Sequence, residues 1–594
     1  MRKVLVVVIL LIASIHFIVA QEDTISLEDV IITIAPFEQR LSATTGSLSI
    51  IKTVPYEELN TINIANQLNR VPGVYISTGT HTTNRVTIRG VGSRTPYSSN
   101  RIRAYYDEIP LTNGDGISTI EDIDLSGISR MEILKGPASA LYGSGLGGVI
   151  LLKTLYPESN GLSWQLGTSF ASFNTIRTNA SIEYKKESTA ISAGYARTQS
   201  KGFRENNSYH RDQFFLHTRT GNQKNTYSFH LIASKLFAEI PSSLNKEDYM
   251  NTPEKASQNW LDINGFEEYY SVNSGGSWMH RISDRWLHKL VLFASLQNPY
   301  ESRPFNILDD ISVRTGLRDY LQFETNKIDI QAGIELFNED YEWKIIETNG
   351  GQPGDLQLHN SEIRRYGNLF AHIRWSPTPD IHIEAGTNFN LLRYNLFTLY
   401  HIDNLDQSGK YSYSPVFSPR LGLSYRIIND HYIHTSIGHG FSAPSLEETL
   451  LPEGIINPDL LPETGWNIDI GIRGWDSGKR LFYDMSSYTI FLSNMLVTER
   501  VTEEIFTGIN AGRARLSGIE IFSRYLLLAP SDKSDWQLTL SSRINLPASL
   551  TTVLISAIIR FRGFLHNFYM EAFNLNTKKN LNLWPKLGLQ ETNI

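Results

Sequence analysis

The chain contains no cysteine among its 594 residues. This absence excludes disulfide bonds, thiolate metal sites and cysteine nucleophiles together. Charged residues are also scarce, at 19% of the chain, and the net charge of −7 gives no basic excess for general nucleic-acid binding. H-E-x-x-H and G-x-S-x-G motifs are missing as well. The sequence therefore predicts a protein that is not an enzyme and has no cofactor, no resident metal ion and no nucleic-acid partner.

Beyond its N-terminus the chain lacks any run of about 18 apolar residues, the length that would predict a transmembrane helix. The N-terminus itself has two basic residues, an apolar stretch from Val4 to Ala13, and a small residue, Ala20, suited to cleavage. This pattern predicts a secretory signal peptide over residues 1–20 and an exported mature chain. An N-terminal membrane anchor is the alternative, but the apolar stretch is too short to span a bilayer comfortably.

Aromatic residues are abundant, with 28 Tyr, 27 Phe and 10 Trp, and from about residue 160 apolar and polar residues alternate. In DIHIEAGTNF, for example, Ile381 and Ile383 alternate with Asp380 and His382. This period of two is typical of β-strands. About seventeen such segments are readable, many near the roughly ten residues that a tilted strand needs to cross a bilayer. Short and long polar connections alternate between them.

These features predict a transmembrane antiparallel β-barrel over residues 160–594, with short turns at one end and long loops at the other. A closed barrel leaves no unpaired backbone in lipid. A soluble β-sandwich would also alternate, so the period alone does not decide between the two. A passive porin or an adhesin is the alternative function for such a barrel.

Residues 41–157 follow a different pattern, which predicts a small α/β domain. Helical spacing through Ile64, Ala65 and Leu68 ends at Pro72 and Gly73. Four short strand-like runs follow: RVTIRGV, IRAYYDEIPL, RMEILKG and GVILLKT. The residues between this domain and the signal peptide, 21–40, form a leader.

One stretch of this domain, KGPASALYGSGLGGVILLKT, contains a formal G-x-G-x-x-G pattern at Gly143, Gly145 and Gly148. A dinucleotide-binding loop requires a helix directly after its glycines, so that the helix N-terminus meets the pyrophosphate. Here the strand-like run from Val149 to Lys153 follows instead. The pattern therefore argues against nucleotide binding, and we interpret the glycines as turns and close backbone approaches.

Several motifs, all in the expected order, resemble those of the TonB-dependent outer-membrane receptors. The N-terminal ones are SLEDVIITIAP, IANQLNRVPGVYI, VTIRGVGSR, YYDEIPL and ISRMEILKGPASALYGSGLGGVILLKT, and the later ones are IGHGFSAPSLEETLLPEGIINPDLLPET and INAGRARLSGIEI. The resemblance covers most of the chain. It implies a barrel of about 22 strands whose lumen holds the α/β domain as a plug, in the outer membrane of a Gram-negative cell. It also implies active import energised by the TonB–ExbB–ExbD complex.

The leader resembles a TonB box over Glu28, Asp29, Val30, Ile31, Ile32 and Thr33. A β-branched, extended segment near a free end can add itself as a strand to the sheet edge of a partner. Pro36 would limit how far such pairing extends. The alternative is a poorly ordered leader with no partner.

Charges within the strand-like runs of the plug form a second candidate group, consisting of Arg89, Arg130 and Glu132. A charge buried between plug and barrel needs a partner. The resemblance implies a polar plug–barrel network that must yield during transport. Ordinary exposed strand charges are the alternative interpretation.

The turn-rich segments SRTPYSSNR and TNGDGIS are expected at the apex of the plug, where the ligand binds. The candidate ligand contacts are Arg94, Tyr97, Arg101, Arg103 and Asn113, which offer cationic, aromatic and amide groups to an anionic chelate. Exposed loop residues without a ligand are the alternative. In YYDEIPL, Glu108 stands where the family usually has glycine, and the sequence alone does not indicate the consequence.

The resemblance leaves the ligand open among the metal chelates that the family imports. A ferric siderophore is the default expectation, with cobalamin as the main alternative. Haem is disfavoured because residues 445–456, where the family's haem receptors tend to place a histidine, contain none. The expected partners are thus an extracellular metal chelate, the energising complex and outer-membrane lipid.

The pattern breaks after about residue 541. The last 55 or so residues show no regular alternation ending on an aromatic residue, and the final residue is Ile594. The strands readable from the sequence are also roughly five fewer than the family's. This suggests a frameshift or truncation, and a barrel that stayed incomplete would have two open edges in lipid.

Overall fold

A computed structural model provides the fold of the chain. The structure describes residues 31–33, 37, 39–52, 64–78, 84–94, 101–113, 116–120, 123–444, 460–500, 506–528, 536–547, 552–561, 567–571 and 586–590. Within these residues no helix has the length and apolar character needed to cross a membrane.

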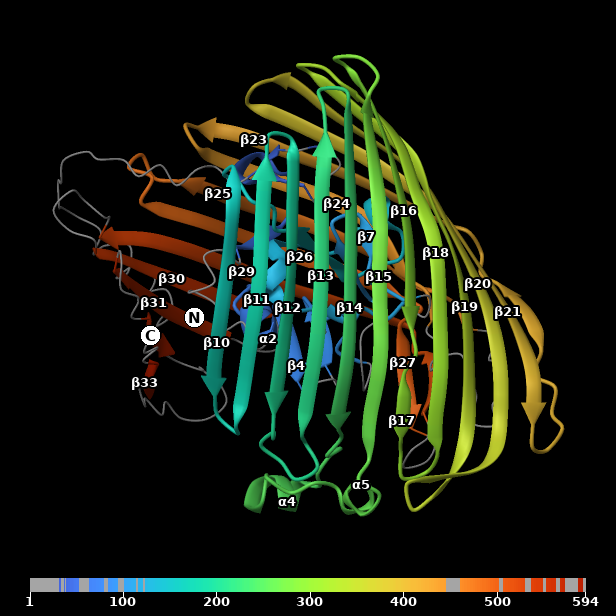
Figure 1. Cartoon of the computed structure of the whole chain (residues 1–594). Coiled ribbons are helices and arrows are strands. Elements are labelled where there is room, and N and C mark those ends of the chain that lie inside the picture. Colours follow the sequence, from blue (N-terminus) through green and yellow to red (C-terminus); the bar gives the residue numbers. More distant parts are fainter. Residues whose placement is uncertain are drawn as a thin grey trace.

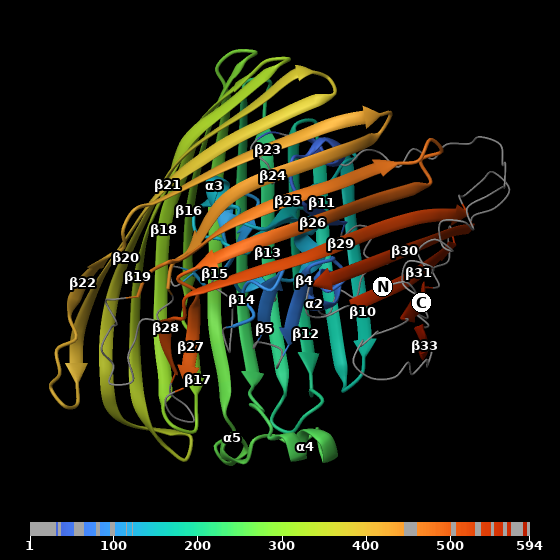
Figure 2. The same ribbon diagram turned by 180° about the vertical axis from the view of Figure 1, so that it is seen from behind.

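A sheet of 20 antiparallel strands in sequence order forms the larger part of the molecule. It curves around the N-terminal domain as the wall of a barrel (Figures 1 and 2). The predicted antiparallel β-barrel is therefore confirmed, with more strands than the sequence reading found. The strands are β10 (Gly161–Ala171), β11 (Thr175–Lys186), β12 (Thr189–Ser200), β13 (Tyr209–Gly221), β14 (Asn225–Glu239), β15 (Phe266–Arg281), β16 (Trp286–Gln297), β17 (Tyr300–Ser302), β18 (Ile307–Glu324), β19 (Ile328–Asn349), β20 (Gln352–Thr378), β21 (Ile381–His401), β22 (Gly409–Ser412), β23 (Val416–Ile428), β24 (His431–Ser442), β25 (Glu463–Trp475), β26 (Leu481–Ser493), β29 (Arg513–Leu528), β30 (Trp536–Pro547) and β31 (Thr552–Phe561).

The alternation in sequence places apolar side chains outward and polar ones inward. On β14, Tyr227 and Phe229 are 50% and 41% exposed on the outer face, whereas His230 and Ser234 are buried on the lumen side. Because successive residues of a strand point to opposite faces, one strand can be apolar toward lipid and polar toward the lumen.

The two ends of the barrel differ in their connections. At one end, called here the short-turn end, strands are joined by 187–188, 222–224, 282–285, 325–327 and 379–380. At the other, the long-loop end, residues 240–265 carry two short helices, α4 (Lys246–Asn251) and α5 (Gln258–Asp262), visible at the bottom of Figure 1. A hairpin of β27 (Leu496–Arg500) and β28 (Phe506–Asn510) extends from the same end. This asymmetry is the one expected from the sequence.

The plug fills the lumen and is drawn in blue in Figures 1 and 2. Its five-stranded sheet has the order β3–β8–β9–β6–β7, in which only β6 and β9 pair in parallel. The predicted α/β plug is confirmed. Its elements are β3 (Leu48–Lys52), α2 (Ile64–Leu68), β4 (Val74–Thr78), β5 (Asn84–Ile88), β6 (Ile102–Tyr106), β7 (Ile109–Pro110), η4 (Leu125–Gly127), β8 (Ile128–Lys135), α3 (Ser139–Tyr142) and β9 (Gly148–Thr154).

Two glycines of the formal nucleotide motif, Gly143 and Gly145, lie between the short helix α3 and strand β9 and contact the barrel wall, and the third, Gly148, begins β9. Gly143 has a φ of +72°, and a Cβ there would overlap the side chains of Tyr366 and Asn368 on the barrel wall. Only glycine allows the loop to approach the wall so closely.

Toward the C-terminus the large sheet ends on β30 and β31. A separate pair, β32 (Asn567–Glu571) and β33 (Lys586–Gln590), follows. Within the described residues, β10 and β31 are the two outermost strands of the large sheet. The predicted domain limits and the suspected aberration after about residue 541 remain predictions.

Candidate functional site at the plug–barrel interface

Arg89 forms the centre of a buried ionic network between plug and barrel. It follows strand β5, and its guanidinium contacts Asp469 of β25 at 2.9 Å and Glu520 of β29 at 3.0 Å. Lys135, at the end of β8, also pairs with Glu520, at 2.8 Å. Burial alone would lower the pKa of Arg89, but the two carboxylates outweigh it and raise that pKa above its ordinary value. Arg89 is therefore a fixed positive charge that holds two barrel carboxylates.

Arg130 and Glu132 lie in β8 and bind each other, with Arg130 Nε 2.7 Å from Glu132 Oε1. The Glu132 carboxylate is fully buried and accepts hydrogen bonds from Thr33 N at 2.9 Å and Thr33 Oγ1 at 3.2 Å. These contacts join the plug sheet to the leader. Whether this pair also belongs to the plug–barrel network remains a prediction.

Half of the expected TonB box can be placed. Glu28, Asp29 and Val30 lie outside the described residues. Ile31 and Ile32 form β1 (Ile31–Ile32), which pairs antiparallel with β2 (Gln39–Arg40). Ile32 is only 1% exposed and packs in the same apolar cluster as Tyr105 of the plug. The C-terminal half of the proposed box is therefore folded against the plug.

The end of the leader and the first residues of the plug are also bonded to the barrel, through contacts that the sequence analysis missed. Arg473 of β25 donates to Leu41 O at 2.8 Å and to Gly46 O at 2.9 Å. Gln39 Nε2 donates to Glu384 Oε1 at 3.0 Å. Arg473 and Glu384 occur within alternating strand segments, where every second residue points inward. The alternation in sequence could have identified both residues as pointing inward. It does not show which inward residue contacts the leader or the start of the plug.

Two of the expected apex residues, Arg94 and Arg101, converge on one barrel carboxylate. Arg94 Nη2 pairs with Glu463 Oε1, and Arg101 Nε lies 3.6 Å from Glu463 Oε2. Arg101 and Glu463 are buried, whereas the Arg94 side chain is 20% exposed. Tyr97 lies outside the described residues. Glu463 begins β25 in the PET segment of a family-like motif, which is the signal that could have identified it.

Arg103 and Asn113 also contact neighbouring groups. Arg103 is buried, donates from Nε to Ser144 O at 2.6 Å, and lies 4.8 Å from the ring centre of Tyr366. Asn113 Nδ2 donates to Gln297 Oε1 of β16 at 3.3 Å. The four described apex residues are thus not gathered on one open surface, and the role of all five in ligand binding remains a prediction.

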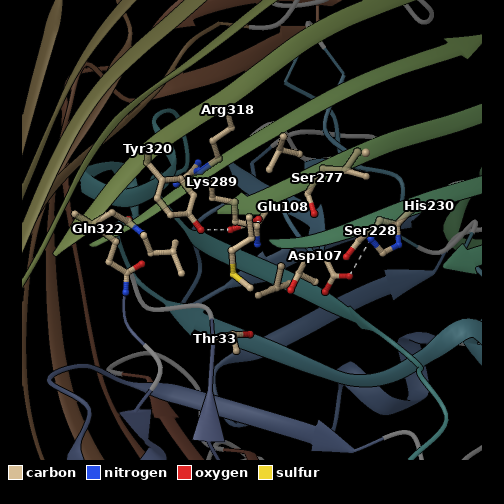
Figure 3. Close-up of a pocket in the computed structure, with 18 of the residues that line it drawn as sticks. Thr33, Asp107, Glu108, Ser228, His230, Ser277, Lys289, Arg318, Tyr320 and Gln322 are labelled. Atoms are coloured by element: carbon tan, nitrogen blue, oxygen red, sulfur yellow. Dashed lines mark hydrogen bonds and ion pairs between the residues drawn. The ribbon is translucent and has the colours of Figure 1, made fainter. Parts of the chain in front are cut away.

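A cavity of about 520 Å³ lies between the plug and the barrel wall, with residues of β14, β15, β16, β18 and β19 among its lining (Figure 3). Glu108 of the plug projects into it, accepts a hydrogen bond from Tyr320 Oη at 2.8 Å and pairs with Lys289 Nζ. Asp107 pairs with Lys153 at 2.6 Å and lies 3.5 Å from His230 Nε2. The residue that replaces the usual family glycine therefore ties the plug to the wall.

The electrostatics of this cavity favour ionised carboxylates on the plug. Burial would raise the pKa of Asp107, but Lys153 and His230 lower it well below its ordinary value. Burial opposes the charge of Glu108 in the same way, and Lys289 outweighs it, so that the pKa of Glu108 is also lowered. Across the part of the chain that the structure describes, no group of three or more histidine or carboxylate side chains is placed to hold a metal ion.

Comparisons with known proteins agree with this architecture. The family model "TonB dependent receptor-like, beta-barrel" matches residues 163–553, and "TonB-dependent Receptor Plug Domain" matches residues 40–149. The vitamin B12 transporter BtuB of Vibrio vulnificus strain CMCP6 is 24% identical over 509 residues, covering 82% of this chain and 74% of that protein.

Two solved structures share the fold at low sequence identity. The ferric yersiniabactin uptake receptor FyuA from Yersinia pestis has 16% identity and a TM-score of 0.69, covering 87% of this chain and 80% of FyuA. The ferric citrate transporter FecA in its unliganded form has 15% identity and a TM-score of 0.71, covering 90% of this chain and 83% of FecA. At these identities the likeness establishes the fold alone.

Proposed function

Because this chain belongs to the family of TonB-dependent receptors, we propose that it imports a scarce metal chelate actively across the outer membrane of a Gram-negative cell. The family comprises outer-membrane transporters that interact with TonB, and they are not enzymes. The plug closes the lumen. Active import therefore requires that a force applied on the periplasmic side is transmitted to the plug.

The observation that carries this proposal is the bonded path from the leader to the lumen. Thr33, the last residue of the proposed box, is held by the buried carboxylate of Glu132 in the central part of the plug sheet. The plug is held in turn by Arg89 and its two barrel carboxylates. A pull on the box therefore acts first on β8, from which it spreads to the plug–barrel contacts. A passive porin has no need of such a path.

For the ligand, a ferric siderophore is the first candidate and cobalamin the second. FyuA and FecA are described as handling ferric yersiniabactin and ferric citrate, and BtuB as transporting vitamin B12. Two arginines near the long-loop end, the partly exposed Arg94 and the buried Arg101, bring positive charge to the side from which an anionic chelate would enter. Haem remains disfavoured because residues 445–456 contain no histidine.

The proposed partners are TonB with its ExbB–ExbD complex, the extracellular chelate and outer-membrane lipid. We place TonB at Glu28–Thr33, where an extended segment can add a strand to the sheet edge of a partner. The outward apolar face of the wall, with residues such as Trp164 and Leu166 of β10, is suited to lipid.

Deletion of residues 28–33 tests the function. Cells that lack other receptors and carry either this chain or the deletion variant are supplied with radiolabelled ferric citrate, ferric ferrioxamine or cyanocobalamin. The intact chain should accumulate one of these compounds, and a protonophore should stop accumulation. The deletion variant should bind the compound at the cell surface without importing it. Import that survives the deletion would refute active transport through the box.

A further inference from the structure

Two cavities follow one another along a single part of the barrel wall. The larger, of about 520 Å³, extends to Met279, Arg281 and Glu324 near the short-turn end of β15 and β18. The smaller, of about 20 Å³, lies toward the long-loop end of the same strands, beside Ser271 of β15 and Ser312 of β18. The plug segment from Asp107 to Asn113 borders both.

The smaller cavity has an uncharged polar lining. Asn113 of the plug faces Ser234, Asn273, Ser295 and Gln297 of the wall. Short hydroxyl and amide side chains bond to water nearly as well as to one another. The plug and the wall can therefore separate at this cavity without leaving a buried charge unpaired. A cavity of this size already has room for a water molecule.

A narrow apolar contact separates the two cavities. Ile109 of β7 packs with Val291 and Phe293 of β16 in one buried cluster. The side chains of Ile109 and Phe293 each lie against a glycine of the barrel wall. A Cβ at Gly275 would lie 2.8 Å from Ile109 Cγ1, and a Cβ at Gly316 would lie 2.6 Å from Phe293 Cε2. Ile109 and Phe293 can therefore fill the space between plug and wall only because both wall positions lack a side chain.

The plug hairpin that carries Ile109 is held by separable polar contacts. Glu108 binds Tyr320 and Lys289 across the larger cavity, and Arg314 Nη2 donates to Pro110 O at 2.8 Å. The Glu108 side chain is 28% exposed, so water can replace its partners as they part. The preceding residue, Asp107, has a φ of +49°, an uncommon conformation for a residue other than glycine.

The wall at β25 and β29 is much harder to separate from the plug. There Arg89 is fully buried between Asp469 and Glu520. Separating such a pair leaves uncompensated charges in a dry interface, which is strongly unfavourable. Opening at β14–β18 separates an apolar contact, the hydrogen bond from Arg314 to Pro110 O, and one ion pair, Glu108–Lys289, that is already partly exposed to water. This side therefore requires less free energy to open.

We propose that the imported ligand passes between the β6–β7 hairpin and strands β14–β18, and that Ile109 against Phe293 is the gate of this passage. The inference rests on the proposed import function and adds its route. When the plug is pulled, Glu108 releases Lys289 and Tyr320, the hairpin withdraws from Gly275, and the two cavities join. The ligand then leaves at the short-turn end.

The charges along this passage fit an anionic chelate. The larger cavity is lined by five cationic side chains, Lys153, Arg219, Arg281, Lys289 and Arg318, and by three carboxylates, Asp107, Glu108 and Glu324. Two of the carboxylates are paired with lysines. Arg318 is paired with Glu335 outside the lining, so Arg219 and Arg281 against Glu324 leave one positive charge in excess, which stabilises a negatively charged ligand in transit. The volume is within the range of about 300–1,000 Å³ typical of small-molecule sites.

A reversible crosslink tests the gate. In the variant Ile109→Cys/Gly275→Cys the two Cβ atoms are close enough for a disulfide, because Ile109 Cγ1, bonded to its own Cβ, lies 2.8 Å from the Cβ position of residue 275. The matched variant Ser139→Cys/Gly440→Cys links the plug to β24, where Ser139 Oγ lies 3.0 Å from the position of a Cβ at residue 440. No native cysteine interferes.

Uptake of radiolabelled ferric citrate, ferric ferrioxamine and cyanocobalamin is measured for both variants, oxidised and then reduced. We expect the 109–275 link to abolish uptake while surface binding persists, and reduction to restore uptake. The 139–440 link should leave uptake intact. Uptake that continues with the 109–275 link closed would overturn the proposal. Loss of uptake in both crosslinked variants would also overturn it, since the plug would then have to move as a whole.

A second pair of variants covers the case in which the reduced double-cysteine protein does not transport. Ser277→Trp fills the larger cavity from β15, and Val272→Trp places the same side chain on the outer face of that strand. Slower uptake only for Ser277→Trp supports the passage, and uptake equal to wild type in both overturns it. If the unaltered chain imports none of the three compounds under energised conditions, the proposed function itself fails. That result is distinct from a failure of the proposed passage, in which the unaltered chain does import.

Discussion

Tyr320 Oη of strand β18 donates a hydrogen bond to Glu108 Oε1 of the plug at 2.8 Å, across the cavity that separates plug from wall. Lys289 of β16 pairs with the other carboxylate oxygen. Glu108 therefore connects a plug hairpin to two barrel strands at once. The resemblance of the YYDEIPL motif implies a glycine at this position in the family, and a glycine could not form this tether.

Glu108→Gly should loosen the plug without unfolding it. The variant loses one ion pair and one charged hydrogen bond, and partial exposure limits the loss to roughly 1 kcal/mol of plug stability. Thermal unfolding in detergent should show the plug transition at a slightly lower temperature. Tyr320→Phe removes only the hydrogen bond and should shift it less. A variant as stable as wild type would mean that the Glu108 contacts contribute nothing net.

Arg89→Met should destabilise the plug–barrel interface far more. The substitution retains a similar length but leaves Asp469 and Glu520 buried, with Lys135 as the remaining cation. Such a change costs about 3–5 kcal/mol. Limited proteolysis of the purified protein should cut the plug of this variant much faster than that of wild type. Equal rates of cleavage would show that the network is not what retains the plug.

Thr33→Val and Glu132→Gln should both release the end of the proposed box from the plug. Thr33→Val removes the hydrogen bond from Thr33 Oγ1 to Glu132 and leaves the one from the backbone N–H, whereas Glu132→Gln removes the charge of the buried carboxylate and also disturbs Arg130. With Ile31→Cys as a single reporter, a water-soluble maleimide should label both variants faster than the parent. If labelling is unchanged, Glu132 does not hold the box.

Lowering the pH should weaken the attachment of the plug near β11 and β13. Asp124 pairs there with Arg177 at 2.7 Å and Arg211 at 3.3 Å. Burial would raise the pKa of Asp124, but Arg177 outweighs it and lowers the pKa below its ordinary value. With the folded pKa depressed, this stabilisation is complete above the ordinary aspartate pKa and is lost as the pH falls through the lower folded value.

Unfolding of the wild type and of Asp124→Asn, followed over that acidic window, provides the measurement. The wild type should lose stability on acidification, while the variant should start less stable and change less. Identical pH profiles would assign the acid sensitivity to other groups.

The sequence by itself determined the class of fold and the order of its parts. Alternation such as that of Ile381 and Ile383 with Asp380 and His382 fixes which face of a strand is polar, because side chains of a strand point alternately to its two faces. The ordered motifs placed the plug before the barrel. Arg89 was recognisable as a charge in need of a partner, since buried charges are rarely left alone.

Only the tertiary structure decided which partners those charges have. Arg89 and Glu520 are separated by 431 positions, and many inward-facing acidic residues were equally suitable in sequence. The period of two shows which residues of a strand point into the lumen. It does not show at what height along the barrel axis each of them meets the plug. That height depends on the register of the strands and on glycines such as Gly275, which lets Ile109 approach the wall. The tether at Glu108 was undetectable for the same reason, because Lys289 and Tyr320 reach Glu108 only once β16 and β18 pack against the plug.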